Sequence, residues 1–153
     1  FDWVAEEGDD SVFSFPRPRV DGAPYDFSFS GLKTAVINQI HNASQKGVEL
    51  PVADLASSFR RAVVDCLVHN FQKAAEDLGY TTLVTAGGVS ANSLLRKRLE
   101  ALCGERGWKL FMPPKDLCGD NAAMVGAQGY YEWKAGNRAG LNLNACATMS
   151  IEG

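Results

Sequence analysis

Three short stretches of the sequence combine glycine with polar side chains in ways that could bind a ligand. The first is AGGVSAN at residues 86–92, which ends a short β-branched apolar run and opens a polar one. Gly87 and Gly88 would let a flat ligand approach the backbone without a Cβ in the way, and the helix start that follows offers free N–H groups. Asn92 can both donate and accept hydrogen bonds, as recognition of adenine or ribose requires. The same residues would also form an ordinary strand-to-helix turn, with Ser90 as the helix cap.

The second stretch is CGDNAAM at residues 118–124, in which Asp120 follows a glycine at an expected helix start. A carboxylate in this position could ligate a metal ion or position a water molecule. The alternative is a purely structural role, because Asp is among the preferred N-cap residues and suits the helix dipole. The spacing alone favours the structural role.

The third stretch is DFSFSGLKT at residues 26–34. A turn at Ser30 and Gly31, with Lys33 near the start of a helix, could hold a phosphate group. The stretch lacks the GxxxxGK[ST] spacing of a P-loop, so a capped strand-to-helix turn is the simpler interpretation. Phe27 and Phe29 could stack on a base, although aromatic residues of strands usually belong to the core.

Regular apolar spacing predicts the elements that must position these stretches. The expected helices cover residues 32–45, 51–78, 90–105 and 120–133, and Gly47 and Gly79 close the first two. The expected strands cover residues 12–15, 25–29, 82–86 and 108–112. From residue 82 onward the order of strand, helix, strand and helix predicts two parallel strands, with the run 82–86 buried on both faces.

Composition limits the class of protein. The chain has 153 residues, of which 46% are hydrophobic and 22% charged, as in one globular domain or one lobe of a larger protein. Its formal net charge of −3 argues against a broad basic surface for nucleic acid, although Arg96, Lys97 and Arg98 leave room for a local one. The four cysteines form no CxxC pair, and no apolar run is long enough to predict a membrane span. Because the chain begins at Phe1 rather than Met, we expect a piece of a longer protein.

Taken together, the three stretches resemble the TsaD family of tRNA threonylcarbamoyltransferases. The matching segments are DFSFSGLKTAV at 26–36, AGGVSANSLLRKRL at 86–99 and CGDNAAMVGAQGYY at 118–131. Each segment alone is a weak signal, but the three occur in the family's order and at similar separations. The resemblance extends from about residue 13 to residue 133, which is most of the chain.

The resemblance implies an α/β fold, namely a ribonuclease-H-like lobe of the actin, Hsp70 and sugar-kinase (ASKHA) superfamily that is truncated on its N-terminal side. Residues 1–24 would be an irregular N-terminal segment, residues 25–136 the partial C-terminal lobe and residues 137–153 a mobile tail. In the family's strand order 3-2-1-4-5, residues 25–29, 82–86 and 108–112 would be strands 3, 4 and 5. Strands 1 and 2 would lie upstream, so we expect exposed strand edges that rearrange or pair between chains to form a dimer.

The resemblance also implies roles for particular residues. Gly87, Gly88 and Asn92 would contact the adenylate, and Asp120 would be one ligand of a single iron or zinc ion. The family's remaining metal ligands come from an HxxxH pair, and this pair and a glycine-rich phosphate loop are both absent here. One carboxylate cannot hold a transition metal firmly, so we expect the chain alone to bind metal weakly or not at all and to be inactive.

The activity that the resemblance implies is transfer of threonylcarbamoyl from threonylcarbamoyl-adenylate to N6 of adenosine 37 in tRNA, in the cytoplasm and without a membrane. The partners would be a paralogous subunit and a P-loop ATPase subunit. An ATP-binding kinase or ATPase of the same superfamily, or a non-catalytic module that binds partner subunits, would be compatible with the same residues. A metalloprotease activity once attributed to the family, as a sialoglycoprotein endopeptidase, has no support, since the sequence contains neither an HExxH pair nor a nucleophile triad.

Overall fold

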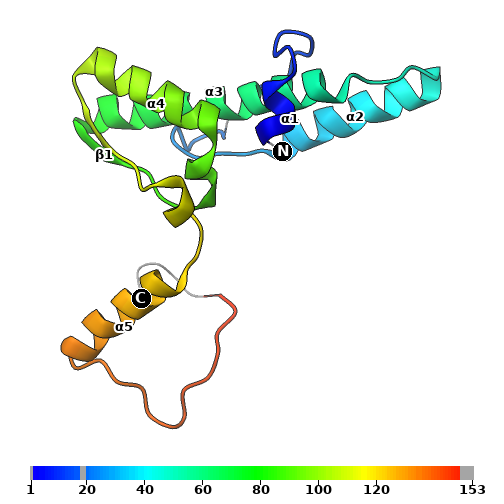
Figure 1. Ribbon diagram of the computed structural model, residues 1–153. Helices are drawn as coiled ribbons and strands as arrows, with labels where there is room; N and C mark the ends of the chain where they lie inside the picture. Colours follow the sequence, from blue (N-terminus) through cyan, green and yellow to red (C-terminus); the bar gives the residue numbers. More distant parts are fainter. Residues whose placement is uncertain (1, 18–19, 149–153) are drawn as a thin grey trace. The chain divides into compact units, whose positions relative to one another are not determined.

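The chain divides into two compact units, Phe1–Gly119 and Asp120–Gly153, in the computed structural model, which describes residues 2–17 and 20–148. The boundary falls inside the range 25–136 expected for the lobe. In chain order the elements are α1 (Asp2–Glu6), α2 (Ser30–Lys46), α3 (Val52–Leu78), β1 (Thr82–Val84), the 3-10 helix η1 (Gly88–Ala91), α4 (Ser93–Arg106), β2 (Lys109–Phe111), the 3-10 helix η2 (Lys115–Leu117) and α5 (Ala122–Lys134). Every element except α5 belongs to the first unit, whose course is shown in Figure 1. No helix among the described residues is long and apolar enough to cross a membrane.

The long helix α3 is the central element of the first unit. Its apolar residues recur every three or four positions, which is the pattern of a helix with one buried face. It ends at Gly79, whose φ of 73° lies in the left-handed region and whose N–H bonds to the carbonyl groups of Ala75 and Glu76. Helix α2 ends in the same way at Gly47, with φ of 64°. The predictions of both helices and of their terminal glycines are confirmed.

Helix α4 lies alongside α3, and the core of the first unit is formed between them (Figure 1). Val64 of α3 and Leu95 and Leu99 of α4 are buried in one cluster. Four partly buried residues of the two helices and one of β2 pack around it: Leu67, Val68, Phe71, Leu94 and Leu110. This contact fixes the start of α4 relative to α3.

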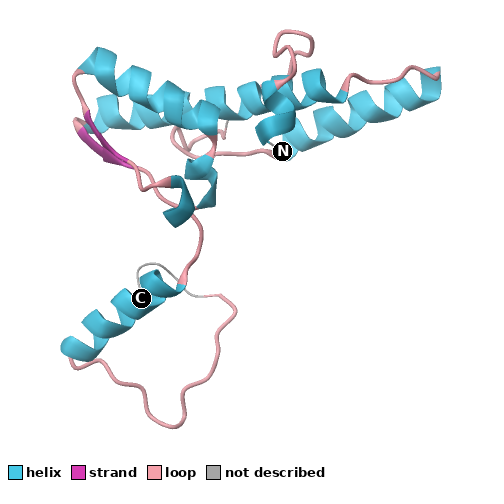
Figure 2. Cartoon of the chain, viewed as in Figure 1, coloured by secondary structure: helices cyan, strands magenta, loops and turns pink. Residues whose placement is uncertain are grey.

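The two short strands pair in parallel, as predicted from the order of elements. Residues Thr82, Leu83 and Val84 of β1 are in register with residues 109–111 of β2 (Figure 2). The expectation that residues 82–86 are buried on both faces is wrong, because Thr82, Val84 and Ala86 are exposed and Leu83 and Thr85 are half-buried. The physical reason is that the helices cover only one face of this sheet in the described part of the chain.

Two predicted strands do not form. Residues 12–15 and 25–29 adopt no strand, and side chains of α3 bond to these backbone segments instead. The N–H of Phe13 donates to Oγ of Ser58 at 3.1 Å. Nδ2 of Asn70 donates to the carbonyl oxygen of Asp26 at 2.8 Å. A strand needs a neighbouring backbone, and the one sheet of the described residues contains only β1 and β2.

The N-terminal helix α1, within a segment that the sequence predicts to be irregular, packs against α3. Ala5 is fully buried, and the guanidinium of Arg60 donates to the carbonyl oxygens of Asp2 and Ala5 at 3.2 and 3.0 Å. The bond to Ala5 satisfies a carbonyl group that the C-terminal end of so short a helix leaves open. Gly8 follows, where a Cβ would clash with the backbone carbonyl of Ala53, so the chain crosses α3 in close contact.

The second unit contains α5 and a stretch without helix or strand at residues 137–148. Helix α5 begins at Ala122 rather than at Asp120, because Asn121 is its N-cap and accepts a hydrogen bond from the N–H of Met124 at 3.1 Å. Of the tail expected at 137–153, residues 149–153 lie outside the described residues. The mixture of helices with a small parallel sheet confirms the α/β class.

Candidate functional site

The stretch at residues 86–92 forms a sharp turn between β1 and α4. Gly87 has φ of 86° and ψ of 165°, a conformation that glycine tolerates and other residues strongly resist. Oγ of Ser90 donates to the carbonyl oxygen of Gly87 at 2.7 Å and thereby closes the turn. Ser90 therefore stabilises the turn and does not cap α4, so that prediction is wrong.

Asn92 is the residue that caps α4. Its Oδ1 accepts a hydrogen bond from the N–H of Leu95 at 3.0 Å, which is the geometry of an N-cap. The structure thus places Asn92, predicted as a ligand contact, at the position where a helix presents free N–H groups. The side-chain carbonyl oxygen of Asn92 therefore already accepts a hydrogen bond from the backbone of α4.

Open space lies over both glycines of the turn. Gly87 and Gly88 are exposed, and a Cβ built on either would meet no atom within 4 Å. A planar group could therefore approach the backbone here, as the sequence predicted. Gly88 has no left-handed φ, so a side chain at this position would be tolerated by the chain itself and would obstruct only a ligand.

An apolar cavity of about 290 Å³ lies beside the turn and is lined in part by Phe27, Val84, Ala86 and Val89. The ring of Phe27 is stacked almost parallel on that of Phe29, with centroids 6.1 Å apart. Thr85 also lines this cavity, and its buried Oγ1 has no hydrogen-bond partner among the described residues. A buried hydroxyl without a partner is costly, but this atom is covered by the chain itself and is not exposed to the cavity.

The carboxylate of Asp2 occupies the N-terminal end of α4. Its Oδ1 accepts from Nδ2 of Asn92 and from Nη1 of Arg60, each at 2.9 Å. Its Oδ2 accepts from the N–H of Ser93 at 2.9 Å and from Oγ of Ser93 at 2.8 Å. Negative charge is favourable at this end of a helix, and here the Asp2 carboxylate supplies it.

These contacts decide the protonation of Asp2. Burial alone would raise the pKa of its carboxyl group, but the hydrogen bonds from Ser93 and Arg60, with the charge of Arg60, lower the pKa to about 2. Asp2 is therefore ionised throughout the physiological range. Sequence reasoning missed this residue, since nothing local signals a partner 90 positions away.

Asp120 opens the second unit, whereas the glycine turn belongs to the first. The alternative that Asp120 caps α5 is wrong, because Asn121 fills that role. Within the described residues no hydrogen bond or ion pair engages the Asp120 carboxylate, and no group of three His, Cys, Asp or Glu side chains could hold a metal ion. A transition metal needs several such donors, so Asp120 alone does not fit an iron or zinc centre.

The third stretch makes no phosphate loop. Ser30 and Gly31 form the first turn of α2 rather than a separate turn before it, and Oγ1 of Thr34 donates back to the carbonyl oxygen of Ser30 at 3.1 Å. The helix N-cap is Phe29, whose side chain makes no capping bond. This stretch contributes Phe27 to the cavity beside the glycine turn and nothing else to the site.

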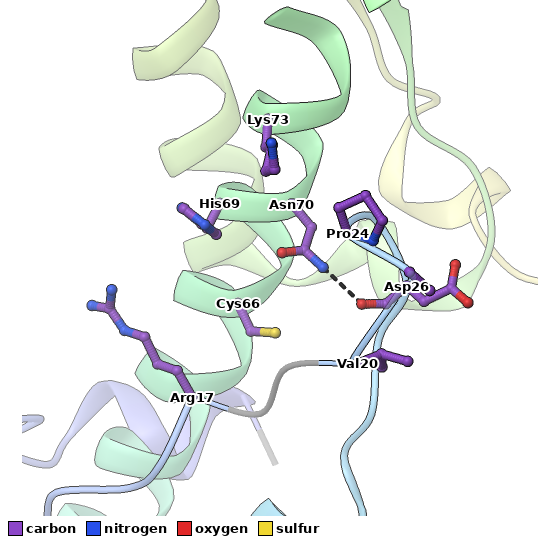
Figure 3. A pocket seen from close by; sticks show the side chains of 9 residues that line it. Arg17, Val20, Pro24, Asp26, Cys66, His69, Asn70 and Lys73 are labelled. Carbon is purple, nitrogen blue, oxygen red and sulfur yellow. Dashed lines mark hydrogen bonds between the residues drawn. The ribbon is translucent and has the colours of Figure 1, made fainter. Parts of the chain in front are cut away.

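A second cavity, of about 320 Å³, lies between α3 and the N-terminal segment (Figure 3). Lys73 and His69 line it together with Cys66 and Arg17. Lys73 is paired with Asp77 at 2.6 Å. Burial raises the pKa of the Cys66 thiol, against a smaller opposing effect of the Arg17 charge, so this thiol is protonated at neutral pH and is a poor nucleophile.

Comparisons with known proteins agree with the three stretches. The family model described as TsaD, tRNA N6-adenosine threonylcarbamoyltransferase, matches residues 1–127. Curated relatives with that name are 44% identical over 151 residues in Staphylococcus carnosus, 46% over 152 in Bacillus cereus (strain ATCC 14579) and 47% over 158 in Limosilactobacillus reuteri. Each alignment covers 99% of this chain, and the chain spans about 44% of the length of these relatives.

Proposed function

We propose that the turn at residues 86–92 binds the adenosine part of threonylcarbamoyl-adenylate, because this chain belongs to the tRNA N6-adenosine threonylcarbamoyltransferase (TsaD) family. The observation that carries the proposal is the open space over Gly87 and Gly88 beside an apolar cavity that Phe27 helps to line. The cavity suits a flat, weakly polar base, and Phe27 offers a ring face for stacking.

Asp2 and Asn92 form the polar side of the proposed site. A carboxylate and an amide at a helix start suit the hydroxyl groups of a ribose. The hydroxyl groups can donate to the carboxylate, and they can both donate to and accept from the amide. Because Asp2 is ionised, it is an acceptor only, and it would favour a neutral sugar over a phosphate at this point. The phosphate of the adenylate would then lie toward the exposed backbone of Gly88.

The proposed reaction of the whole enzyme is acyl transfer. The N6 amine of the tRNA adenosine attacks the carbamoyl carbon, the bond from that carbon to the phosphate oxygen breaks, AMP leaves, and the amine loses a proton. In this chain the residues of the turn would bind and orient the adenylate, and no general base is assigned. Asp120 is proposed as one ligand of an iron or zinc ion whose remaining ligands are not among the described residues. The chain by itself is therefore proposed to bind nucleotide without catalysing transfer.

The finer fold assignment also belongs to this proposal. The helices and the parallel pair of strands would be part of a ribonuclease-H-like ASKHA lobe, and free strand edges would pair between chains to give a dimer.

The proposed substrates are threonylcarbamoyl-adenylate and tRNA, the proposed partners are a paralogous subunit and a P-loop ATPase subunit, and the proposed place of action is the cytoplasm. Each of these would follow from the family as a whole.

Calorimetric titration with AMP tests the proposal. We expect binding in the range of about 1 mM, equivalent to about 4 kcal/mol, because only the nucleotide part of the ligand is offered. Gly88→Ala adds a methyl group where the chain itself has room, so it should weaken AMP binding about tenfold while leaving the fold intact. Gly104→Ala, also unobstructed and within α4, is the matched control and should bind AMP like the unmodified chain. Equal affinity of the two variants would contradict the placement of the nucleotide.

A further inference from the structure

The side-chain hydroxyl of Ser93 lies between two carboxylate groups of α1. Its Oγ is 2.8 Å from Oδ2 of Asp2 and 3.0 Å from Oε1 of Glu6. A hydroxyl has a single hydrogen to donate, so the two oxygens compete for it, and rotation about the Cβ–Oγ bond moves it between them. Ser93 is the first residue of α4 and directly follows Asn92, so this competition takes place at the edge of the proposed adenosine site.

The carboxylate of Asp2 has no acceptor capacity to spare while Ser93 bonds to it. A carboxylate offers about four lone-pair sites on its two oxygens. Oδ1 accepts from Arg60 and Asn92, and Oδ2 accepts from both the N–H and the Oγ of Ser93. The group is nevertheless accessible, because the Asp2 side chain is 35% exposed. A ribose hydroxyl that donates to Asp2 must therefore displace one of these donors.

The other donors cannot leave Asp2 without loss. Arg60 is buried, and its guanidinium would be left without its nearest carboxylate partner. The N–H of Ser93 lies at the open end of α4, where a helix provides no acceptor of its own. The amide of Asn92 is held at its other end, because its Oδ1 accepts from the N–H of Leu95.

The hydroxyl of Ser93 is the exception, because a second acceptor already lies within bonding distance. The side chain of Glu6 is 58% exposed, and its Oε1 is 4.0 Å from Nη1 of Arg60, too far for a hydrogen bond. Glu6 therefore has acceptor capacity for this hydroxyl. When Ser93 donates to Glu6, one site on Oδ2 of Asp2 becomes free and no donor loses its partner.

We propose that Glu6 is a positioning residue of the adenosine site, which accepts the hydrogen bond of Ser93 when a ribose hydroxyl donates to Asp2. Each hydroxyl keeps its own hydrogen, and only the acceptors are exchanged. The inference rests on the proposed function for its ligand and adds a residue that the nucleotide itself does not touch. It also narrows the ligand class to nucleotides with free ribose hydroxyl groups, because a phosphate on these hydroxyls would lie against two carboxylates.

A purely structural role for Glu6 makes a different prediction. If Glu6 only supports α1 through its charge near Arg60, its removal would change AMP binding equally whether or not residue 93 carries a hydroxyl. If Glu6 acts through Ser93, its effect on AMP binding disappears once the hydroxyl is removed. A double-mutant cycle separates the two roles, because it measures the coupling between the two side chains.

The experiment is an NMR titration with AMP of the unmodified chain, Glu6→Ala, Ser93→Ala and the double variant. Glu6→Ala should weaken AMP binding about fivefold, which corresponds to the loss of one ordinary hydrogen bond. Ser93→Ala should bind AMP at least as tightly as the unmodified chain, because Oδ2 of Asp2 then has a free site from the outset. In the double variant the effect of Glu6→Ala should be absent.

Two further variants distinguish the hydrogen bond from the charge of Glu6. Glu6→Gln keeps an acceptor oxygen at this position and should recover most of the affinity for AMP. The matched control is Glu7→Ala, which removes the same charge at the next position and should bind AMP like the unmodified chain. A loss in Glu6→Gln or Glu7→Ala as large as that in Glu6→Ala would overturn the inference, since the charge alone would then explain the effect.

Dideoxy-AMP, whose ribose lacks both hydroxyl groups, provides a second measurement. It has no hydroxyl to donate to Asp2, so Glu6→Ala should leave its affinity unchanged. An equal loss for AMP and dideoxy-AMP, or an equal effect of Glu6→Ala with and without the Ser93 hydroxyl, would contradict the role of Glu6 alone. Failure of AMP to bind the unmodified chain would instead contradict the proposed adenosine site, and this inference with it.

Discussion

Nδ2 of Asn92 donates to Oδ1 of Asp2 at 2.9 Å and joins residues that are 90 positions apart in the chain. The other end of the same amide accepts from the N–H of Leu95, so Asn92 both caps α4 and anchors α1 to it. The polar side of the proposed adenosine site is thus pre-formed by a contact between α1 and the N-cap of α4. A ribose that binds there must share or exchange these bonds.

Asp2→Asn should lower the free energy of unfolding by about 1 kcal/mol, because the charged bonds to Arg60 and the N-terminal end of α4 are replaced by weaker neutral ones. The variant keeps the size of the side chain, so the loss reports on charge rather than packing. Urea unfolding followed by circular dichroism measures it. Asp21→Asn, at an exposed loop position, should change stability by less than about 0.5 kcal/mol. A similar loss in both variants would contradict the role of Asp2.

The stability that Asp2 contributes should depend on pH in a defined window. Its pKa is about 2 in the folded chain against 3.8 for an ordinary aspartate, so the folded state favours the ionised form. The contribution is complete above pH 3.8 and is lost as pH falls from there toward 2. Since the side chain is 35% exposed, solvent screening limits the effect to about 1 kcal/mol. In Asp2→Asn this part of the acid destabilisation should disappear, which unfolding curves at a series of pH values would detect.

Leu99→Ala should cost about 2–4 kcal/mol, because Leu99 is buried in the cluster between α3 and α4 and its removal leaves a cavity. The same loss should loosen the start of α4 and weaken AMP binding. Val48→Ala removes two methyl groups from an exposed position and should be nearly neutral. Thermal or urea unfolding compares the two, and a mild effect of Leu99→Ala would argue against this core.

The chain should retain well below one metal ion per molecule after incubation with zinc or ferrous iron and gel filtration, because Asp120 is a single donor. Elemental analysis by mass spectrometry gives the stoichiometry. Asp120→Ala should not change the retained amount. One tightly held ion per chain that is lost in Asp120→Ala would show that other ligands gather around this residue.

Much of the fold follows from local patterns in the sequence. The spacing of apolar residues predicted α2 and α3, glycine predicted where both end, and the order of elements predicted the parallel pairing of β1 and β2. These features depend on neighbours in the sequence, which is why they could be predicted. The strand expected at residues 25–29 depends on a neighbouring strand, and the backbone there bonds to Asn70 instead.

The candidate site also has features that residue type alone could predict and features that it could not. The openness of the turn at Gly87 and Gly88 follows from residue type, and it was predicted. The sequence predicted Ser90 and Asp120 as helix caps, but Asn92 and Asn121 are the N-caps of α4 and α5. Neighbouring polar residues compete for the same cap, and only the backbone geometry selects one of them. Asp2 could not be predicted, since its partners are brought to it by the packing of α1 and α4 on α3.

The most direct test of the central claim is a heteronuclear NMR titration of the chain with AMP, which reports on each backbone N–H separately. The account predicts that the largest shift changes occur at Thr85, Gly87, Gly88 and Asn92, with smaller changes at Asp2. Arg17, Arg61 and Arg98 should shift little, because they line a different cavity. Changes confined to residues outside this turn, or no saturable change at millimolar AMP, would contradict the assignment of residues 86–92 as the adenosine site.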